Sequence, residues 1–298
     1  MQILAQFLDH VRLERRLSDN TARAYGSDLA LFLGFLARHE GEEITVAHLE
    51  RLKARDVRAY LAERRNGGMS DASAARVLSS IKQLFTWLHR VHGVDAAEIS
   101  YLEGPRRKAH LPRPVTELAA RDMIADAGAR TELPWVAARD SAMLSLLYGA
   151  GLRISEALAV TVGMLPAPET LRVLGKGQKV RLVPLIPAVR QAMDAYADAL
   201  PFRLAPDDPV FRGVRGGPLG PRAVQALVED LRFRLGLPDT ATPHALRHAF
   251  ATHLLANGAD LRAIQSLLGH ASLATTQVYT GVDAARLQSV HSAAHPRA

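Results

Sequence analysis

One segment near residue 110 interrupts the periodic patterns of the chain and divides the sequence in two. Residues 104–114 contain three prolines and four arginine or lysine side chains, with no helical or strand periodicity. Because proline lacks an amide hydrogen and clashes with the preceding helical turn, neither a helix nor a sheet continues easily through such a segment. At about 100 to 200 residues per domain, a chain of 298 residues accommodates two domains. We therefore predict a domain at residues 1–103, a linker at 104–113 and a second domain at 114–298.

The first domain shows the spacing of amphipathic helices. Apolar residues recur three and four positions apart in residues 2–16, from Tyr25 to Leu36, in residues 54–65 and from Ala74 to Leu88. Ser70 or Asp71 offers an N-cap for the last of these helices. Its apolar stripe lies opposite Arg76 and Lys82, so the basic face is either solvated or in contact with a phosphate backbone.

The second domain is also mostly helical, with one exception. Helical spacing is found in residues 117–127, 135–148, 187–199 and 221–235, and three further helices are expected between His244 and Tyr279. Residues 171–174 and 179–184 instead alternate apolar and polar side chains around a Gly-Lys-Gly-Gln turn, which is typical of a β-hairpin. We predict a mainly α-helical protein with a small antiparallel β-sheet and with Lys176 at the hairpin tip.

The charge of the chain favours a polyanionic partner. The net charge is +7 and the sequence pI is about 10.0, which is more typical of a nucleic-acid-binding protein than of a metabolic enzyme, although an ordinary basic surface is the alternative. Residues 51–110 carry 12 basic and 6 acidic groups, whereas residues 1–50 carry 5 and 8. The linker either follows a DNA backbone or is a solvated hinge. Candidate DNA contacts are Arg76, Lys82, Arg106, Arg107 and Lys108.

Composition excludes several other classes of protein. The chain has no cysteine, so disulfides, thiolate nucleophiles and zinc-thiolate sites are excluded. Residues 1–9 lack the basic start and the apolar run of a signal peptide, and no stretch of about 18 apolar residues is present. These features lead us to expect a cytoplasmic protein without a membrane anchor.

Several residues in the second domain have the chemistry that transesterification at phosphorus needs without a metal ion. Arg153 and Arg247 could each bind two phosphate oxygens and stabilise the transition state by fixed charge. Tyr279 offers a hydroxyl as a covalent nucleophile. An ammonium can give a proton to the leaving oxygen and a guanidinium cannot, which favours Lys176 as the acid. Only five of the 37 basic residues are lysines, which makes this choice more specific.

Each of these residues also has an ordinary structural explanation when it is taken singly. The hairpin could be a solvated turn, His270 a helix-end hydrogen-bonding group, and Tyr279 a packed aromatic residue. His244 and His248 are four apart, as in zinc sites, but no glutamate adjoins His244 and Arg247 places a fixed cation between them. The Gly-Lys-Gly-Gln turn lacks the spacing of a nucleotide-binding loop. We predict neither a metal nor a cofactor.

In its ordered set of motifs the chain resembles the tyrosine recombinases, the phage integrase family. The resemblance is carried by Arg153, Lys176, the His244-x-x-Arg247 pair, Leu-Leu-Gly-His270 and Tyr279. It implies a helical, SAM-like core-binding domain and a catalytic domain that close as a C-shaped clamp on DNA. Glu156 and His248 match family positions that we interpret as orienting residues. Gly281 departs from the family, whose members often carry histidine there.

The resemblance also implies a mechanism. Tyr279 would attack the scissile phosphate and form a 3′-phosphotyrosine, Lys176 would protonate the leaving 5′-oxygen, and Arg153, His244, Arg247 and His270 would bind and activate the phosphate. Energy is conserved in the covalent bond, so ATP and metal ions are not required.

Within the family, the chain is similar to the Xer group of bacterial chromosome-dimer resolvases. This implies a bipartite DNA site, a heterotetramer with a related recombinase, a Holliday junction, and activation by the division-septum DNA translocase. Alternatives are a phage or mobile-element integrase, which would usually carry an additional arm-binding domain, a type IB topoisomerase, and a catalytically silent DNA-binding protein of the same fold.

The C-terminal tail carries one more pattern. Residues 283–291 have a short apolar stripe on a segment too small to fold alone. The stripe is expected to pack either on its own catalytic domain or on a neighbouring subunit, where it would couple cleavage between subunits.

Overall fold

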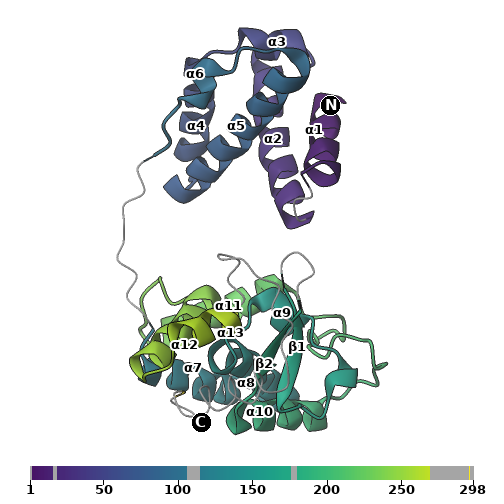
Figure 1. The fold of residues 1–298 in the computed structure, drawn as a ribbon, viewed down its shortest axis with the longest axis vertical. Coiled ribbons are helices and arrows are strands. Elements are labelled where there is room, and N and C mark those ends of the chain that lie inside the picture. Colours follow the sequence, from purple (N-terminus) through teal and green to yellow (C-terminus); the bar gives the residue numbers. More distant parts are fainter. Residues whose placement is uncertain (1, 16–18, 106–114, 176–179, 269–294, 296–298) are drawn as a thin grey trace. The chain divides into compact units, whose positions relative to one another are not determined.

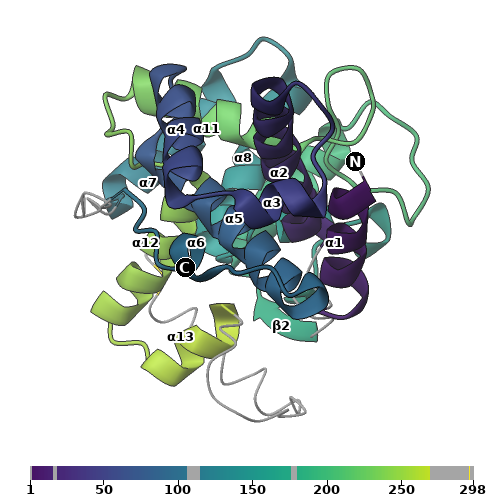
Figure 2. The same ribbon diagram turned by 90° about the horizontal axis from the view of Figure 1, so that it is seen from above.

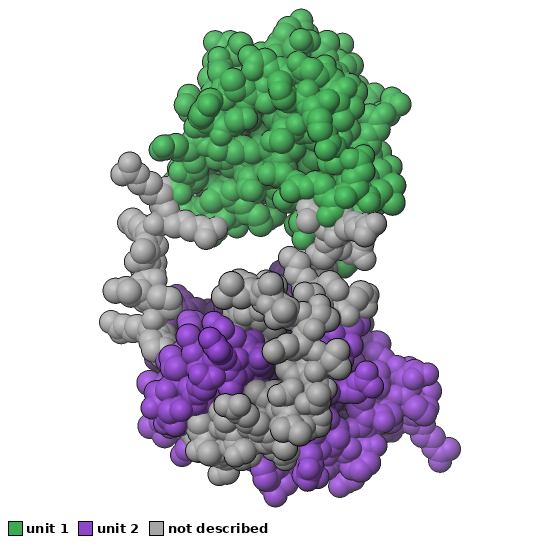
Figure 3. All heavy atoms as spheres, in the orientation of Figure 1, with its two compact units in different colours: residues 1–110 green, residues 111–298 purple. Residues whose placement is uncertain are grey.

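The chain forms two compact units in a computed structural model, residues 1–110 and residues 111–298 (Figure 1, Figure 3). The structure describes residues 2–15, 19–105, 115–175, 180–268 and 295. Each unit has a hydrophobic core made of its own side chains. Most of the predicted linker lies outside the described residues, so the domain limits given above stay a prediction.

All the secondary-structure elements among the described residues of the first unit are helices. Its helices are α1 (Gln2–Leu13), α2 (Asp19–Glu40), α3 (Val46–Arg51), α4 (Ala54–Asn66), α5 (Asp71–His92) and α6 (Ala97–Ser100). Helix α5 contacts α2, α4 and α6, and it lies in the middle of the unit in Figure 2. The aromatic side chains of Phe7, Phe32, Tyr60 and Phe85 are fully buried in this core.

Helix α5 begins at the N-cap that the sequence predicts. The Ser70 hydroxyl oxygen accepts a hydrogen bond from the Ser73 backbone N–H at 3.2 Å, which satisfies one free amide of the first turn. Gly93 ends the helix with φ of 69°, in the left-handed region that favours glycine. The apolar stripe from Ala74 to Leu88 is buried as predicted.

The second unit is built around helix α8. Its helices are α7 (Glu117–Ala129), α8 (Pro134–Gly149), α9 (Ile154–Leu158), the 3-10 helix η1 (Val162–Met164), α10 (Pro187–Ala199), α11 (Pro221–Arg234), α12 (Pro243–Ala256) and α13 (Leu261–Leu268). Twelve of the 16 residues of α8 are buried, as expected for a helix that is apolar on nearly all sides. Helices α7, α9, α10 and α12 pack against it.

The predicted hairpin is present as strands β1 (Thr170–Leu174) and β2 (Val180–Pro184). The strands are antiparallel, with Thr170 paired to Pro184 and Leu174 to Val180. Strand β2 begins at Val180, and the turn residues 176–179, which include Lys176 and Lys179, lie outside the described residues. Arg181 and Val183 are both buried on one face of β2, which contacts α13.

The predicted fold class, mainly α-helical with a small antiparallel sheet, is confirmed. Three short elements, α3, α6 and η1, were not predicted, because segments of three to six residues show no measurable period. Of the three helices expected between His244 and Tyr279, the structure describes α12 and α13. No helix among the described residues has both the length and the apolar character that a membrane crossing requires.

The C-terminal tail is described at a single position. His295 is buried in the second unit, and its Nε2 lies 3.3 Å from the backbone oxygen of Tyr148. The apolar stripe at 283–291 lies outside the described residues, so both expectations for its packing stay predictions.

Candidate active site

The turn between α8 and α9 approaches α12 more closely than any residue with a side chain allows. Gly151 has φ of 61°, and an added Cβ would lie 2.5 Å from the Phe250 ring. The Gly151 carbonyl oxygen accepts a hydrogen bond from Nη1 of Arg247. The turn thereby places Arg153, the N-cap residue of α9, beside α12.

A single carboxylate, Glu156, lies at the centre of the candidate site and binds three arginines. Its Oε1 accepts hydrogen bonds from Nη1 of Arg153 at 2.8 Å and from Nη1 of Arg181 at 2.7 Å. Its Oε2 accepts one from Nη2 of Arg181 at 2.8 Å and lies 3.4 Å from Nη1 of Arg247. Three guanidinium groups around one carboxylate leave a surplus of two positive charges.

The exposure of these groups is uneven. The side chains of Glu156, Arg181 and Arg247 are 4%, 6% and 6% exposed, whereas that of Arg153 is 40% exposed. Arg153 is therefore the arginine of this cluster with the most access to a ligand.

The buried carboxylate is ionised. Burial by itself would raise the pKa of Glu156, but hydrogen bonds from the Arg181 side chain and from the Arg153 backbone N–H lower the pKa to about 2. Arg247 shows the opposite effect, since burial and the positive charges of Arg153 and Arg181 lower its pKa to about 10. Both groups are charged at neutral pH.

The start of α9 is capped by a side chain of the same helix. The backbone N–H of Arg153 donates to Oε2 of Glu156 at 2.8 Å, so the helix is capped by its own carboxylate. The carboxylate three residues downstream therefore occupies the Arg153 amide. The Arg153 guanidinium is the group that can reach a ligand.

Helix α12 carries Arg247 into the cluster. The Thr242 hydroxyl oxygen accepts a hydrogen bond from the Ala245 N–H at 3.1 Å, and Pro243 occupies the first turn, where it needs no donor. Leu246, Phe250 and Leu254 form the buried face of the helix. Nη2 of Arg247 donates to the Leu268 carbonyl oxygen at 2.5 Å, which joins α12 to the end of α13.

Comparison with known proteins identifies the family. Residues 129–286 match the model of the phage integrase family, and residues 4–92 match that of the phage integrase N-terminal SAM-like domain. Tyrosine recombinase XerC of Brucella suis biovar 1 is 48% identical over 98% of this chain and 94% of its own length. Tyrosine recombinase XerC of Methylobacterium nodulans is 52% identical over 99% and 92%.

The chain belongs to the phage integrase family. It is a site-specific tyrosine recombinase, an enzyme that binds DNA. Between XerC and XerD of the Xer group, the sequence favours XerC, and these relatives confirm that resemblance. A solved structure of XerH site-specific recombinase bound to difH substrate has the same fold, with a TM-score of 0.62 at 20% identity over 93% of this chain and 77% of that chain.

The recombinase contains one site residue that the sequence analysis missed. Arg181 binds both oxygens of Glu156, and its Nε donates to the Leu267 carbonyl oxygen at 2.9 Å. Alternation along β2 could have indicated it, because Arg181 has the same phase as the buried Val183. An arginine at an inward position of a strand requires a buried anionic partner.

The two described histidines of the signature lie on the surface of α12. His244 and His248 are both exposed, one helical turn apart, and His244 is three residues from Arg247. Among the described residues, no group of three or more histidine, aspartate or glutamate side chains is arranged to hold a metal ion. Glu156 contacts all three arginines, consistent with its interpretation as an orienting residue.

Several predicted site residues cannot be placed. Those outside the described residues are Lys176, His270, Tyr279, Arg106, Arg107 and Lys108. Their described neighbours are informative all the same, since Leu267 and Leu268, which immediately precede Gly269 and His270, bind Arg181 and Arg247 through their carbonyl oxygens.

In the first unit, Arg76 has a protein partner. Its Nη1 forms an ion pair with the buried Asp28, which also accepts a hydrogen bond from the Ser80 hydroxyl at 3.0 Å. The Arg76 side chain is still 51% exposed. Lys82 is half-buried on the same helix.

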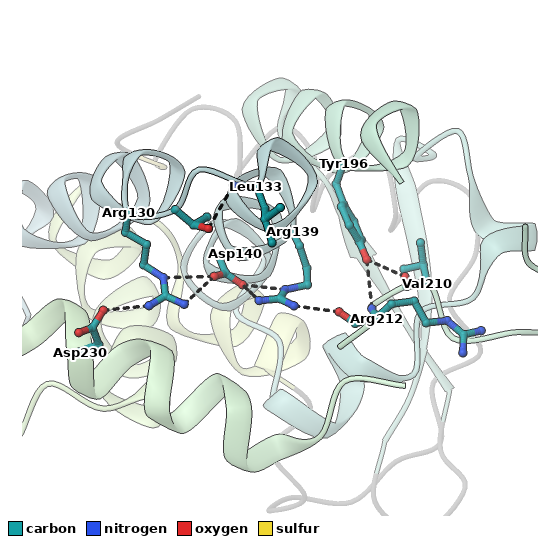
Figure 4. A network of polar contacts seen from close by, with 9 residues as sticks. Arg130, Leu133, Arg139, Asp140, Tyr196, Val210, Arg212 and Asp230 are labelled. Carbon is teal, nitrogen blue, oxygen red and sulfur yellow. Dashed lines mark hydrogen bonds and ion pairs between the residues drawn. The ribbon is translucent and has the colours of Figure 1, made fainter. Parts of the chain in front are cut away.

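A second arginine cluster lies elsewhere in the second unit, which is also called the catalytic unit below (Figure 4). Asp140 accepts hydrogen bonds from Nε and Nη2 of Arg130 at 3.3 and 3.2 Å, and from Nε of Arg139 at 2.8 Å. Nη1 of Arg130 donates to Asp230 at 2.9 Å, and Nη1 of Arg139 donates to the Arg212 carbonyl oxygen at 2.9 Å. Two arginines and two aspartates thus balance each other.

Proposed function

We propose that the surplus of two positive charges around Glu156 binds the scissile phosphate of a recombination site. Arg153 and Arg247 would bind its non-bridging oxygens, and His244 and His270 would assist them. The observation that carries this proposal is that three arginines share one buried carboxylate, so part of their charge is left for a phosphate.

The chemical step uses Tyr279 and Lys176. The Tyr279 oxygen forms a bond to phosphorus while the bond to the 5′-oxygen breaks, which leaves a 3′-phosphotyrosine and a 5′-hydroxyl. The proton of the attacking hydroxyl passes to an imidazole of the site, and the Lys176 ammonium gives a proton to the leaving oxygen. Attack of a 5′-hydroxyl from another strand reverses the step and rejoins the DNA, so neither a metal ion nor ATP is consumed.

The similarity to XerC proteins supports a proposal for the biological role. We propose that the recombinase pairs with an XerD-like recombinase in a heterotetramer on a bipartite dif-like site and exchanges strands through a Holliday junction. An FtsK-like DNA translocase at the division septum would activate it, and chromosome dimers would be resolved before cell division. A chromosomal substrate in a bacterium implies action in the cytoplasm. The XerH protein, of the same fold, has been solved on its difH substrate.

The two domains divide the work of DNA binding. We propose that residues 1–103 form the core-binding domain, that residues 104–113 form the linker, and that the domain at residues 114–298 closes with the first around the duplex as a C-shaped clamp. Arg76, Lys82 and the basic linker residues Arg106, Arg107 and Lys108 would contact the phosphate backbone, which positions the protein without reading sequence.

A suicide substrate tests this proposal. A dif-like site from the same chromosome, nicked near the cleavage position so that religation is prevented, should trap a covalent adduct with the wild-type protein on a denaturing gel. Tyr279→Phe should bind the site with unchanged affinity and form no adduct. Adduct formation by Tyr279→Phe would refute Tyr279 as the nucleophile.

The same experiment separates the alternatives. Sequence-specific binding without an adduct by the wild-type protein would indicate a silent DNA-binding protein of this fold. Cleavage restricted to a mobile-element attachment site, with none at the dif-like site, would indicate an integrase.

A further inference from the structure

We infer that Arg181 is a positioning residue of this recombinase, which neutralises and orients Glu156 so that Arg153 and Arg247 keep their charge for the phosphate. The inference rests on the proposed phosphate-binding roles of Arg153 and Arg247. Arg181 itself is 6% exposed, so it acts through Glu156 and not by touching DNA.

The geometry of Arg181 is that of a rigid clamp. Its Nη1 and Nη2 each donate to a different oxygen of Glu156, at 2.7 and 2.8 Å, in the parallel arrangement that fits a guanidinium to a carboxylate. Its Nε donates to the Leu267 carbonyl oxygen at 2.9 Å. The carboxylate is therefore fixed from β2, and its remaining lone pairs are left for Arg153 and Arg247.

The Arg181–Glu156 ion pair changes the net charge that the arginine cluster presents to the phosphate. Without Arg181, the charge of Glu156 would cancel one of the two charges of Arg153 and Arg247, and the cluster would present +1 to the substrate in place of +2. In a buried site with a low effective dielectric, one unit charge within a few ångströms of a phosphate is a large effect. Arg181 restores the second charge while remaining out of contact with the substrate.

The Arg181–Glu156 ion pair also joins the elements that surround the site. Arg181 and Arg247 bind consecutive carbonyl oxygens, of Leu267 and Leu268, at the end of α13. Strand β2, the start of α9, helix α12 and the end of α13 thus meet at Glu156 and its arginines. A displaced Glu156 would allow Arg153, the most exposed of the three arginines, to change its orientation.

The alternative is that Arg181 only stabilises the fold, and Arg139 provides a matched control for that role. Arg139 is 7% exposed, binds Oδ1 of Asp140 through Nε and Nη2 at 2.8 and 2.7 Å, and donates to a backbone carbonyl oxygen at 2.9 Å. Its chemistry matches that of Arg181, but it belongs to the balanced cluster. Arg139→Met should therefore reproduce the stability effect of Arg181→Met without its effect on chemistry.

The first test is a charge-balance cycle in the full-length protein. Arg181→Met should slow single-turnover adduct formation by about 10- to 100-fold, the range typical of residues that orient a directly acting group, with DNA affinity nearly unchanged. Adding Glu156→Gln returns the cluster to +2 and should recover most of the lost rate. Failure of the double variant to exceed Arg181→Met, at a temperature where both are folded, would overturn the inference.

The second test uses a substrate with less charge. A methylphosphonate at the scissile position replaces one charged non-bridging oxygen by a methyl group, so the transition state depends less on the +2 cluster. The rate deficit of Arg181→Met relative to wild type should shrink on this substrate, whereas Arg139→Met should behave like wild type on both substrates. An Arg181→Met deficit of equal size on both substrates would show that Arg181 is merely structural.

One further variant covers the case of unfolding, and one comparison distinguishes failure of the positioning role from failure of the proposed function. If Arg181→Met unfolds below the assay temperature, Arg181→Gln, which also removes the charge but keeps a hydrogen-bond donor, replaces it under the same criterion. An inactive wild-type protein, or full activity of Arg153→Ala, would refute the proposed function. A normal Arg181→Met rate beside a defective Arg153→Ala would refute the positioning role alone.

Discussion

The catalytic unit contains two arginine clusters that are built in the same way and differ in their balance of charge. In the cluster of Figure 4, Arg130 and Arg139 are matched by Asp140 and Asp230. Around Glu156, three arginines share one carboxylate. The first arrangement is balanced in charge, whereas the second has a surplus of two positive charges, which we propose that an anion balances. The difference separates an ion-pair network that maintains a fold from one that is prepared for a ligand.

The unbalanced cluster carries an electrostatic cost in the free protein. Burial and the nearby charges of Arg153 and Arg181 lower the pKa of Arg247 to about 10, which reports that its charged form is disfavoured there. A phosphate between Arg153 and Arg247 would relieve this repulsion. Strained electrostatics of this kind is expected at functional sites and is rare elsewhere.

The largest expected effect contrasts one arginine from each cluster. Arg247→Ala should lower the rate of adduct formation by about 10²- to 10³-fold, because it removes direct stabilisation of the transition state. Arg139→Ala should leave that rate within a few-fold of wild type while lowering the free energy of unfolding by about 3 kcal/mol, since it breaks a buried ion pair. Single-turnover cleavage and urea unfolding of both variants test the contrast. An equal loss of rate in Arg139→Ala would break it.

A smaller effect concerns stability at low pH. The pKa of Glu156 is lowered from 4.5 to about 2 on folding, so its ionisation stabilises the fold above about pH 4.5, and this contribution is lost as the pH falls toward 2. The stability advantage of wild type over Glu156→Gln should therefore shrink by roughly 1 to 2 kcal/mol between pH 6 and pH 3. Urea unfolding at the two pH values measures it. An advantage that is constant with pH would mean that Glu156 has no lowered pKa in the fold.

The smallest expected effect concerns positive charge outside both clusters. If Arg106, Arg107 and Lys108 contact phosphates, neutralising all three should reduce the slope of log affinity against log salt by about 0.9 for each lost contact, or up to roughly 2.7. The rate of the chemical step and the sequence preference should hardly change. Titrations at several salt concentrations give the slope. An unchanged slope would identify the linker as a solvated hinge.

Much of the fold could be predicted because the information is local. The buried stripe of α5, its cap at Ser70 and its end at Gly93 are all contained within the segment itself. The hairpin likewise follows from alternation on both sides of a glycine-containing turn. Short elements such as α3 escaped prediction, since six residues make less than two helical turns and their position is fixed by packing.

By itself, the sequence determined the helical architecture, the hairpin and the family, because periodicity, caps and ordered motifs are properties of neighbouring residues. It also supplied Arg153, His244 and Arg247 as candidate site residues. Only the tertiary structure decided that Glu156 gathers three arginines and that Arg181 is one of them. Arg181 is 25 residues from Glu156 in the chain, and Arg247 is 91 residues from it. Local patterns indicate which way such side chains face, but the packing of β2, α9, α12 and α13 determines what they meet.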